Sequence, residues 1–501
     1  MFFNRLLSFL VLSLLLLTNA WSFDEVDFHN VGQGHCVVAT STKGILVIDA
    51  GSSSTMGVDG ILEEKEGKFQ ALADKISDSI AGRIKKPDIP LNFIMTHADK
   101  DHINLSYLIV EVLLKKKAIL VEKVKFILGG KEQEYSTGDA TDLAGFLKEK
   151  KIPHCYGESF KPLAEGLLWV PPDSLDFVFG PDDISFLSVK SEIASKAPKK
   201  SSKPSKSKAS SQPPNESAKR NASSIVVRVI CKKSSVMITG DKTRPEIANI
   251  IAKHEKQGKA DLLKSDIVLA THHGSAEDFS PEWLKAVNPA YLVLSCGTSS
   301  FFHPRYEAVC SPAVLSNMRL VKDVPWHPVR FFEERGGGAD FREAKDKFFP
   351  VCLDKPANFR ATPYTYAMTN LGIYVTADQG TINFSFNEGK GIVVKASKQH
   401  GDVNVVTAFS SFLRSSKEWS KIIFPAPAFL PENIVWVTAN CTGLTSLDLG
   451  GCNASDAATK DLCDLIVARP SLTSVNLSPN SISEANKRKI IEAWNHRGLT
   501  I

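Results

Sequence analysis

Four side chains that bind metal ions lie within six residues of one another, in the segment THADKDH at 96–102. They are His97, Asp99, Asp101 and His102. The segment follows a short apolar run, and a tight loop at a strand end can direct the first pair to one ion and the second pair to another. Mixed nitrogen and oxygen donors suit Zn²⁺, Mn²⁺ or Fe²⁺ better than Ca²⁺. Because four such groups are costly to gather unpaired in a partly buried loop, the spacing predicts a metal-binding loop.

Further candidate ligands follow apolar runs later in the chain. Asp241 ends VMITGD, the pair His272 and His273 follows IVLAT, and His303 lies just beyond YLVLSCG. Singly, each has an ordinary explanation, since an aspartate often caps a helix and a histidine often stands in a loop. As a set at successive strand ends, they predict that functional groups converge at one edge of a layered fold.

Strands and helices alternate around these candidates. VVAT, GILVIDAG and LNFIMTH predict short buried strands, and residues 61–84 have the apolar spacing of a helix. Further on, SSIVVRVICKKSSVMITGD predicts two strands joined by a turn, and Thr243 with Pro245 predicts a helix start. This alternation predicts an α/β protein.

The motifs H-x-D-x-D-H, G-D, H-H-G-S and H-P, in this order, resemble the metallo-β-lactamase fold, and in particular the ComEC-type competence-protein nuclease domain and its stand-alone relatives. HNVGQGHCVVAT, GILVIDAG, FVFGPDD, NASSIVVRV and GIYVTADQGTINFSF resemble further strands of that family. The resemblance spans about residues 24–387. It implies an αββα sandwich, a hydrolase domain over 23–387, and two divalent ions, Zn²⁺ or alternatively Mn²⁺.

The resemblance also implies roles for the candidate residues. It divides the ligands between two ions: His97, Asp99 and one member of the pair His272/His273 for the first, and Asp101, His102 and His303 for the second, with Asp241 bridging. Asp49 is expected to orient a ligand rather than to bind metal. Asp101, Asp241 and His273 are the catalytic candidates, while Ser275 and Lys100 are candidate phosphate contacts that ordinary solvated loop residues would explain equally well.

The chain departs from the family pattern beside the predicted site. Asn30 and His35 stand where the opening motif of the family has two aspartates, and Ile103-Asn104-Leu105 replaces x-Gly-Gly after the Asp-His pair. Losing those glycines changes how closely the backbone can approach a substrate. None of the proposed ligands is lost, so metal binding is expected.

The resemblance implies hydrolysis of a phosphodiester by a hydroxide shared between the two metal ions. The substrate is DNA or a smaller phosphodiester such as a choline phosphoester. Two alternatives stay open: an ester or lactone hydrolase, because the fold supports many reactions, and a non-catalytic secreted protein that binds a partner through its C-terminal tail.

Composition excludes several other protein classes. With 43% hydrophobic and 23% charged residues, the 501-residue chain is neither globally disordered nor a collagen or coiled coil. Its net charge of +5 arises in one tract rich in Lys, Ser and Pro at about 190–220, which holds nine basic and two acidic residues. The tract predicts a disordered insertion, which would also suit a tether for phosphate-rich polymers. The remaining chain carries about −2, so no basic nucleic-acid face is predicted.

The N-terminal residues 1–22 predict a signal peptide. Arg5 precedes an apolar run at 6–17, and Ala20 or Ser22 offers a cleavage position. A membrane-spanning helix needs about 20 apolar residues, so an uncleaved anchor is the weaker alternative. We therefore expect a secreted or periplasmic protein without a membrane span after cleavage. Nine cysteines without a C-x-x-C pair exclude a zinc ribbon and allow one or two disulfides.

An internal repeat marks the C-terminal segment, 432–501, which follows a predicted connector at 388–431. LTSLDLGGCN at Leu444 recurs as LTSVNLSPN at Leu472, a period of 28 residues. The pattern resembles a leucine-rich repeat. About two repeats cannot form a stable solenoid alone, so the segment is expected to cap the preceding domain or to pair with another copy. It is also the candidate surface for a protein partner.

Overall fold

The computed structural model describes residues 23–496 with several internal gaps. The longer gaps are 191–215, 333–347 and 355–363, and the shorter ones are 57, 62–64, 164–165, 176, 178, 180–181, 298–300, 320, 323, 388, 390, 399–404, 416–418 and 425–430. The predicted signal peptide and most of the Lys/Ser/Pro tract lie outside the described residues. Within the described part, no helix combines the length and apolarity that crossing a membrane requires.

The first sheet contains eight strands among the described residues. In spatial order they are β19 (Gly391–Ala396), β18 (Ile382–Asn387), β1 (Glu25–Phe28), β2 (Cys36–Thr40), β3 (Ile45–Ala50), β4 (Leu91–Met95), β5 (Val124–Leu128) and β6 (His154–Tyr156). The strands from β3 to β6 run parallel, whereas the strands from β19 to β3 pair antiparallel. Every residue of β4 is buried, as is typical of a parallel strand covered on both faces.

The second sheet also has eight strands in the described part of the chain. Its order is β17 (Ile373–Val375), β13 (Tyr291–Leu294), β12 (Ile267–Leu269), β11 (Ser234–Ile238), β10 (Val226–Cys231), β9 (Ile184–Ser188), β8 (Leu168–Val170) and β7 (Lys161–Leu163). The neighbours from β11 to β17 are parallel. Their carboxyl ends therefore share one edge, where the loops with Asp241, His272 and His303 begin.

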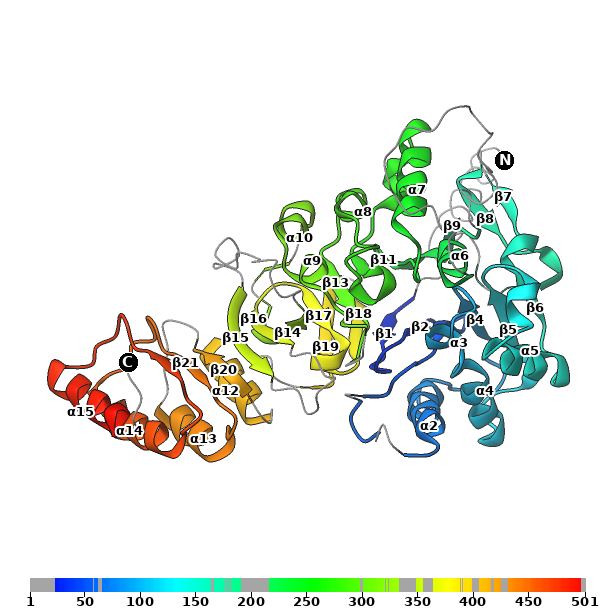
Figure 1. Ribbon diagram of the computed structural model, residues 1–501. Helices are drawn as coiled ribbons and strands as arrows, with labels where there is room; N and C mark the ends of the chain where they lie inside the picture. Colours follow the sequence, from blue (N-terminus) through cyan, green and yellow to red (C-terminus); the bar gives the residue numbers. More distant parts are fainter. Residues whose placement is uncertain are drawn as a thin grey trace, which may run out of the picture.

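The two sheets face each other across an apolar core. Ile48 and Phe384 from the first sheet belong to the same buried cluster as Val227 and Leu269 from the second. Helices cover the outer faces: α2 (Lys68–Ala81), α4 (Ser106–Lys115) and α5 (Ala140–Glu149) pack on the first sheet, and α7 (Arg244–Lys256) and α8 (Pro281–Val287) pack on the second (Figure 1). The layers run helix, sheet, sheet, helix, which confirms the predicted α/β sandwich.

Short helices complete the sandwich. They are α3 (Lys100–Ile103), α6 (Glu216–Ala222), α9 (Tyr306–Val309), α10 (Pro312–Asn317) and α11 (Thr376–Gln379). Helix α6 corrects the predicted disordered insertion at about 190–220, whose last residues are helical. The buried Lys242 ammonium group explains this order, since it donates to the Ala222 carbonyl at 2.8 Å and the Ser224 carbonyl at 3.1 Å.

A third sheet joins the middle of the chain to its C-terminal segment (Figure 1, yellow-green to red). Its described strands are β14 (His327–Phe331), β16 (Thr365–Thr369), β15 (Phe348–Asp354), β20 (Trp419–Ile423), β21 (Ser446–Asp448) and β22 (Ser474–Asn476), in spatial order. Helices α12 (Val405–Ser415), α13 (Pro431–Asn440), α14 (Thr459–Ala468) and α15 (Glu484–Asn495) accompany it. The range 388–431, expected as a connector, instead supplies β19, α12 and β20, because strand pairing extends both flanking sheets into it.

The internal repeat matches the register in which strands β21 and β22 pair. Strands β21 and β22 pair in parallel with Ser446 opposite Ser474, an offset equal to the 28-residue period. Asn476 Nδ2 donates to Asp448 Oδ1 at 2.9 Å across the same offset. Membership of the leucine-rich-repeat class stays a prediction. The eight cysteines whose side chains are described are all free, so this part of the chain contains no disulfide.

Candidate metal centre

The candidate ligands of the 96–102 segment are placed by β4 and α3. The last residue of β4 is Met95, His97 follows in a tight loop, and Asp99 is the N-cap residue of α3. His97 and His102 are fully buried. The loop lies against the second sheet, because the Ile225 N–H donates to the Thr96 carbonyl at 2.9 Å. The two sheets thus bring their strand ends together here.

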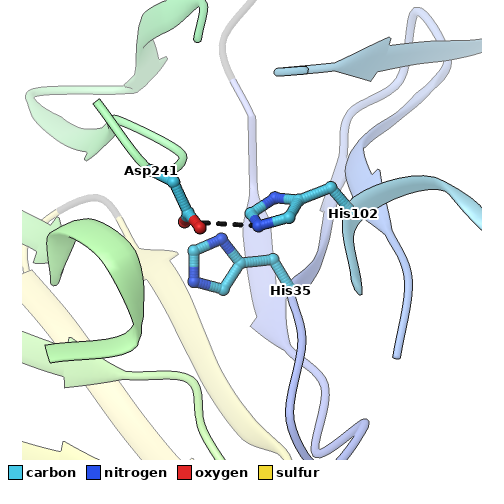
Figure 2. Close-up of side chains that lie close together, drawn as sticks. All are labelled: His35, His102 and Asp241. Atoms are coloured by element: carbon cyan, nitrogen blue, oxygen red, sulfur yellow. Dashed lines mark ion pairs between the residues drawn. The ribbon is translucent and has the colours of Figure 1, made fainter. Parts of the chain in front are cut away.

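Asp241 lies at the centre of four histidines. Its carboxylate is 3.2 Å from Nε2 of His102, 3.6 Å from Nε2 of His272, and 3.9 Å from Nε2 of both His97 and His273. Figure 2 shows this carboxylate facing His102. The position is central enough for one carboxylate to serve two ions.

The Nδ1 atoms of three histidines are held by outer partners. His102 donates to Asp49 Oδ2 at 2.7 Å, His272 to Asp278 Oδ2 at 2.5 Å, and His273 to the Ser295 carbonyl at 2.8 Å. Each bond fixes the ring and leaves Nε2 as the atom directed at the centre, an arrangement typical of metal-binding histidine.

His272 and His273 have left-handed backbone conformations, with φ of 49° and 55°. Residues with a side chain rarely adopt this conformation, at a cost of roughly 1–2 kcal/mol each. It lets two consecutive side chains turn toward the same carboxylate. His273 also lies 3.3 Å from Asp101 Oδ2, so the structure groups His273 with Asp101 and His102, whereas the resemblance implied that one member of the pair acts with His97 and Asp99.

His303 lies beside the histidine pair. Its ring centroid is 5.5 Å from that of His272 and 6.1 Å from that of His273. The structure does not bring it into the close group of Asp101 and His102, with which it was expected to act. Its buried Nδ1 lacks a hydrogen-bond partner among the described residues, so it stays a candidate ligand.

Burial and the clustered carboxylates set the protonation of the site. Burial lowers the pKa of His97 to about 4 and that of His303 to about 3. Burial also opposes protonation of His102, but the carboxylates of Asp241 and Asp49 outweigh it and raise the pKa of His102 well above its usual value. The carboxylates of Asp241 and Asp278 likewise outweigh burial and raise the pKa of His272 to about 9. The surrounding histidines hold the pKa of Asp241 well below its usual range despite burial.

Several buried polar atoms at the site lack hydrogen-bond partners in the described structure. They are Nε2 of His97, His102 and His273, Oδ1 of Asp241, Nδ1 of His303 and both ring nitrogens of His35. Leaving such atoms unsatisfied is costly. Metal coordination would satisfy them, so the residues present fit divalent ions.

Asp99 makes contacts that the sequence did not predict. Arg220 Nε and Ser217 Oγ, both from α6, donate to its carboxylate, the latter at 3.1 Å. Its Oδ2 also lies 3.8 Å from His97 Nε2. Arg220 is therefore a site residue that sequence reasoning missed, because it lay at the end of a tract predicted to be disordered.

The two predicted phosphate contacts have other neighbours. The Lys100 ammonium group lies 3.6 Å from Asp139 and 5.5 Å from the Phe69 ring centroid, so it is directed away from the histidine cluster. Ser275 is buried, and its hydroxyl accepts from the Glu277 N–H at 3.3 Å.

Two further residues complete the site. Asp49 accepts from the Thr96 N–H at 2.7 Å and the Thr96 hydroxyl at 2.9 Å as well as from His102, which is the orienting position expected for it. His35 enters the cluster beside His102 (Figure 2). The sequence signal for His35 was its place in the opening motif, where we noted it only as a departure.

Comparisons with known proteins give partial matches. No family model matches the chain. It is 27% identical over 129 residues to competence protein ComA of Neisseria gonorrhoeae, covering 26% of this chain and 18% of that protein. It is 24% identical over 309 residues to ComE operon protein 3 of Bacillus subtilis, covering 60% of this chain and 31% of that protein. The chain therefore spans less than a third of either relative.

Solved structures give weaker matches. The metallo-β-lactamase fold protein YhfI of Bacillus subtilis has a TM-score of 0.27 at 11% identity, covering 54% of this chain and 85% of that one. The short form of human tRNase Z has a TM-score of 0.29 at 12% identity, covering 54% and 92%. The facing mixed sheets fit the metallo-β-lactamase fold.

Proposed function

We propose that this chain is a metal-dependent hydrolase that cleaves phosphodiester bonds. The observation that carries the proposal is the position of Asp241, whose carboxylate lies within 3.9 Å of Nε2 of four histidines at the meeting edge of two sheets. One carboxylate shared by two donor groups is the arrangement that binuclear hydrolases need.

In this proposal the donors divide into two groups. His97 and Asp99 hold the first ion, and Asp101, His102 and His273 hold the second, with Asp241 shared. Zn²⁺ or Mn²⁺ suits these nitrogen and oxygen donors. When bound, the ions lower the pKa of an attacking water and neutralise the phosphate oxygens.

The remaining residues position groups and move protons. His272 is the more exposed member of the pair, with 28% of its side chain accessible, and its pKa is raised to about 9 by Asp241 and Asp278 against the effect of burial. His272 lies outside the two close donor groups and its Nδ1 donates to Asp278, so we assign it to donate a proton to the leaving group. Asp49 and the Ser295 carbonyl keep the rings of His102 and His273 in place.

Arg220 supports a phosphate-containing substrate. Its side chain is 32% exposed, and Nε is occupied by Asp99, so the other guanidinium donors are available to an anion beside the ligands. Guanidinium groups bind phosphate oxygens well. The ComEC-type resemblance supports DNA as the substrate. The signal-peptide pattern at residues 1–22 supports export, so that the chain would act outside the cytoplasm.

Hydrolysis of a chromogenic phosphodiester by the purified protein tests the proposal. The wild type is assayed with Zn²⁺, with Mn²⁺ and after chelation, beside the double variant Asp101→Ala/His102→Ala. Activity that needs metal and disappears in the variant supports the proposal, and single-stranded DNA, duplex DNA and a choline phosphoester are then compared. Folded, metal-loaded protein that cleaves a lactone or carboxylic ester but no phosphodiester would overturn it.

A further inference from the structure

We infer that His35 is an additional protein ligand of the ion held by Asp101, His102 and His273. The inference rests on the metal centre of the proposed function and extends it to a residue that departs from the family's opening motif and was not among the predicted ligands. It is carried by the burial of the ring, its unpartnered nitrogens and its place among the other donors.

The backbone around His35 is fastened to both halves of the site. The His35 N–H donates to the Asp101 carbonyl at 2.9 Å, and the His35 carbonyl accepts from the Gly51 N–H at 3.0 Å. Ser295 of the second sheet donates to the Gly34 carbonyl at 2.8 Å. These bonds hold the ring of His35 at a defined position beside Asp101.

Two glycines allow this close approach. A Cβ atom at Gly34 would lie 2.1 Å from the Gly51 carbonyl oxygen and 2.8 Å from that of Asp101. A Cβ atom at Gly51 would lie 2.3 Å from the His102 nitrogen. Larger residues at these positions would push the segment with His35 away from the ligand loop. Glycine at both positions therefore allows His35 to lie beside Asp101 and His102.

The ring of His35 lies close to the side chains already assigned as metal ligands. One nitrogen of His35, one of His102 and a carboxylate oxygen of Asp241 lie within 4.8 Å of one another. The three side chains come from separate segments and point toward a common centre (Figure 2). The ring centroid of His35 is 4.7 Å from that of His102 and 4.3 Å from that of His273.

The alternative is a histidine that merely fills the core, and other buried histidines show what that looks like here. His254 places Nδ1 2.8 Å from the Ile250 carbonyl, and His327 has a carbonyl oxygen 2.7 Å from each ring nitrogen. His35 is fully buried, yet neither nitrogen has a hydrogen-bond partner among the described residues, and its Nδ1 is 3.7 Å from Asp49. A metal ion would supply the missing partner.

A histidine ligand at position 35 affects which metal ion the site prefers. With His35, His102 and His273, the second group offers three imidazoles beside the carboxylates of Asp101 and Asp241. Imidazole favours Zn²⁺ and similar transition metals, whereas carboxylate-rich sites suit Mn²⁺ and Mg²⁺. The inference therefore predicts that Zn²⁺ occupies this position in preference to Mn²⁺.

Metal binding tests the inference without an activity assay. Wild type, His35→Ala, His35→Asp and a control, His29→Gln, are stripped with a chelator and reloaded with Zn²⁺ or Co²⁺. His29 is a suitable control because it is buried six residues upstream and lies outside the donor groups of the described structure. Bound metal is counted by elemental analysis, Zn²⁺ affinity is measured by chelator competition, and Co²⁺ absorption reports the ligand set.

We expect His35→Ala to weaken binding of one ion by at least roughly tenfold, as ligand removal does, and to change the Co²⁺ spectrum. His35→Asp should bind the ion that His35→Ala binds weakly. It should bind Mn²⁺ better than the wild type does and differ from the wild type in its Co²⁺ spectrum. His29→Gln should match the wild type. If His35→Ala fails to fold, the metal preference and Co²⁺ spectrum of His35→Asp decide whether His35 is a ligand.

Two results would overturn the inference in distinguishable ways. A folded His35→Ala variant with wild-type stoichiometry, affinity and Co²⁺ spectrum would show that His35 only fills the core, and the proposed function would stand. A wild type that binds no divalent ion would remove the proposed metal centre and His35 with it.

Discussion

The Asp49 carboxylate accepts a hydrogen bond from His102 Nδ1 at 2.7 Å, across 53 residues of sequence. The same carboxylate accepts from the backbone and hydroxyl of Thr96. One buried acid therefore fixes both the tautomer of a candidate ligand and the loop that carries the others. Such outer partners usually matter nearly as much as the ligands themselves.

Replacing Asp49 by Asn should weaken Zn²⁺ binding by roughly 10–100-fold, because the neutral amide has one acceptor oxygen instead of two and cannot hold both Thr96 and His102 as the carboxylate does. Chelator competition measures the effect, and circular dichroism confirms folding. Asp24→Asn is the matched control, since the Asp24 carboxylate is 44% exposed and pairs with Lys232 on the surface. Equal Zn²⁺ affinity in both variants would contradict the orienting role.

Replacing Arg220 by Ala should lower Zn²⁺ affinity for one ion by roughly 10–100-fold, because Asp99 loses the guanidinium that positions it. The phosphodiesterase kcat/KM should fall as well. Lys219→Ala is the control on the same helix, since the Lys219 ammonium group pairs with Glu216 at the surface. If Arg220→Ala binds metal and substrate as Lys219→Ala does, Arg220 has no part in the site.

The metal-free protein should lose stability as the pH falls below the ordinary histidine value of 6.5, because burial lowers the pKa of His35 and His303 to about 3 and that of His97 to about 4. Between those values and 6.5 the unfolded chain binds protons that the folded chain does not, so stability is full above this window. The expected loss is up to about 1.4 kcal/mol per histidine for each pH unit.

Urea unfolding in chelator at about pH 7, 6 and 5 checks this expectation. His303→Asn should show a smaller loss, because one of the three groups is removed. His272 has the opposite sign: its pKa is raised to about 9, so its ion-pair stabilisation is present below 6.5 and is lost as the pH rises through about 9. A flat profile between about pH 7 and 5 would contradict the assigned protonation states.

Replacing Asn104 by Ala should destabilise the fold by about 1–3 kcal/mol, since it leaves buried backbone groups without partners. Asn104 Oδ1 accepts from the Ser52 N–H at 2.8 Å, and its Nδ2 donates to the Ser52 carbonyl at 2.9 Å. Urea denaturation measures the change, with Asn440→Ala as an exposed control whose amide donates only to Trp436 in its own helix. Equal midpoints would show that this bridge contributes nothing.

The sequence alone determined the parts of the site that are local. His97, Asp99, Asp101 and His102 share a loop of seven residues, so strand geometry and spacing were enough to predict it. The strand ends carrying Asp241 and His273 were also readable, because runs of apolar residues predict buried strands and parallel strands end at one edge. The α/β class followed from the same periodicity.

Only the tertiary structure decided the contacts between distant segments. Arg220 contacts Asp99 across 121 residues of sequence, and His35, just before β2, lies beside His102 of α3. Local sequence spacing predicts neither pairing. Which member of the pair joins Asp101 was decided by the distance between two remote segments, since His273 Nε2 lies 3.3 Å from Asp101 and His272 lies outside that group. The third sheet likewise pairs β15 with β20, so the predicted connector became part of a sheet, because strand pairing is set by long-range hydrogen bonds rather than by neighbours in sequence.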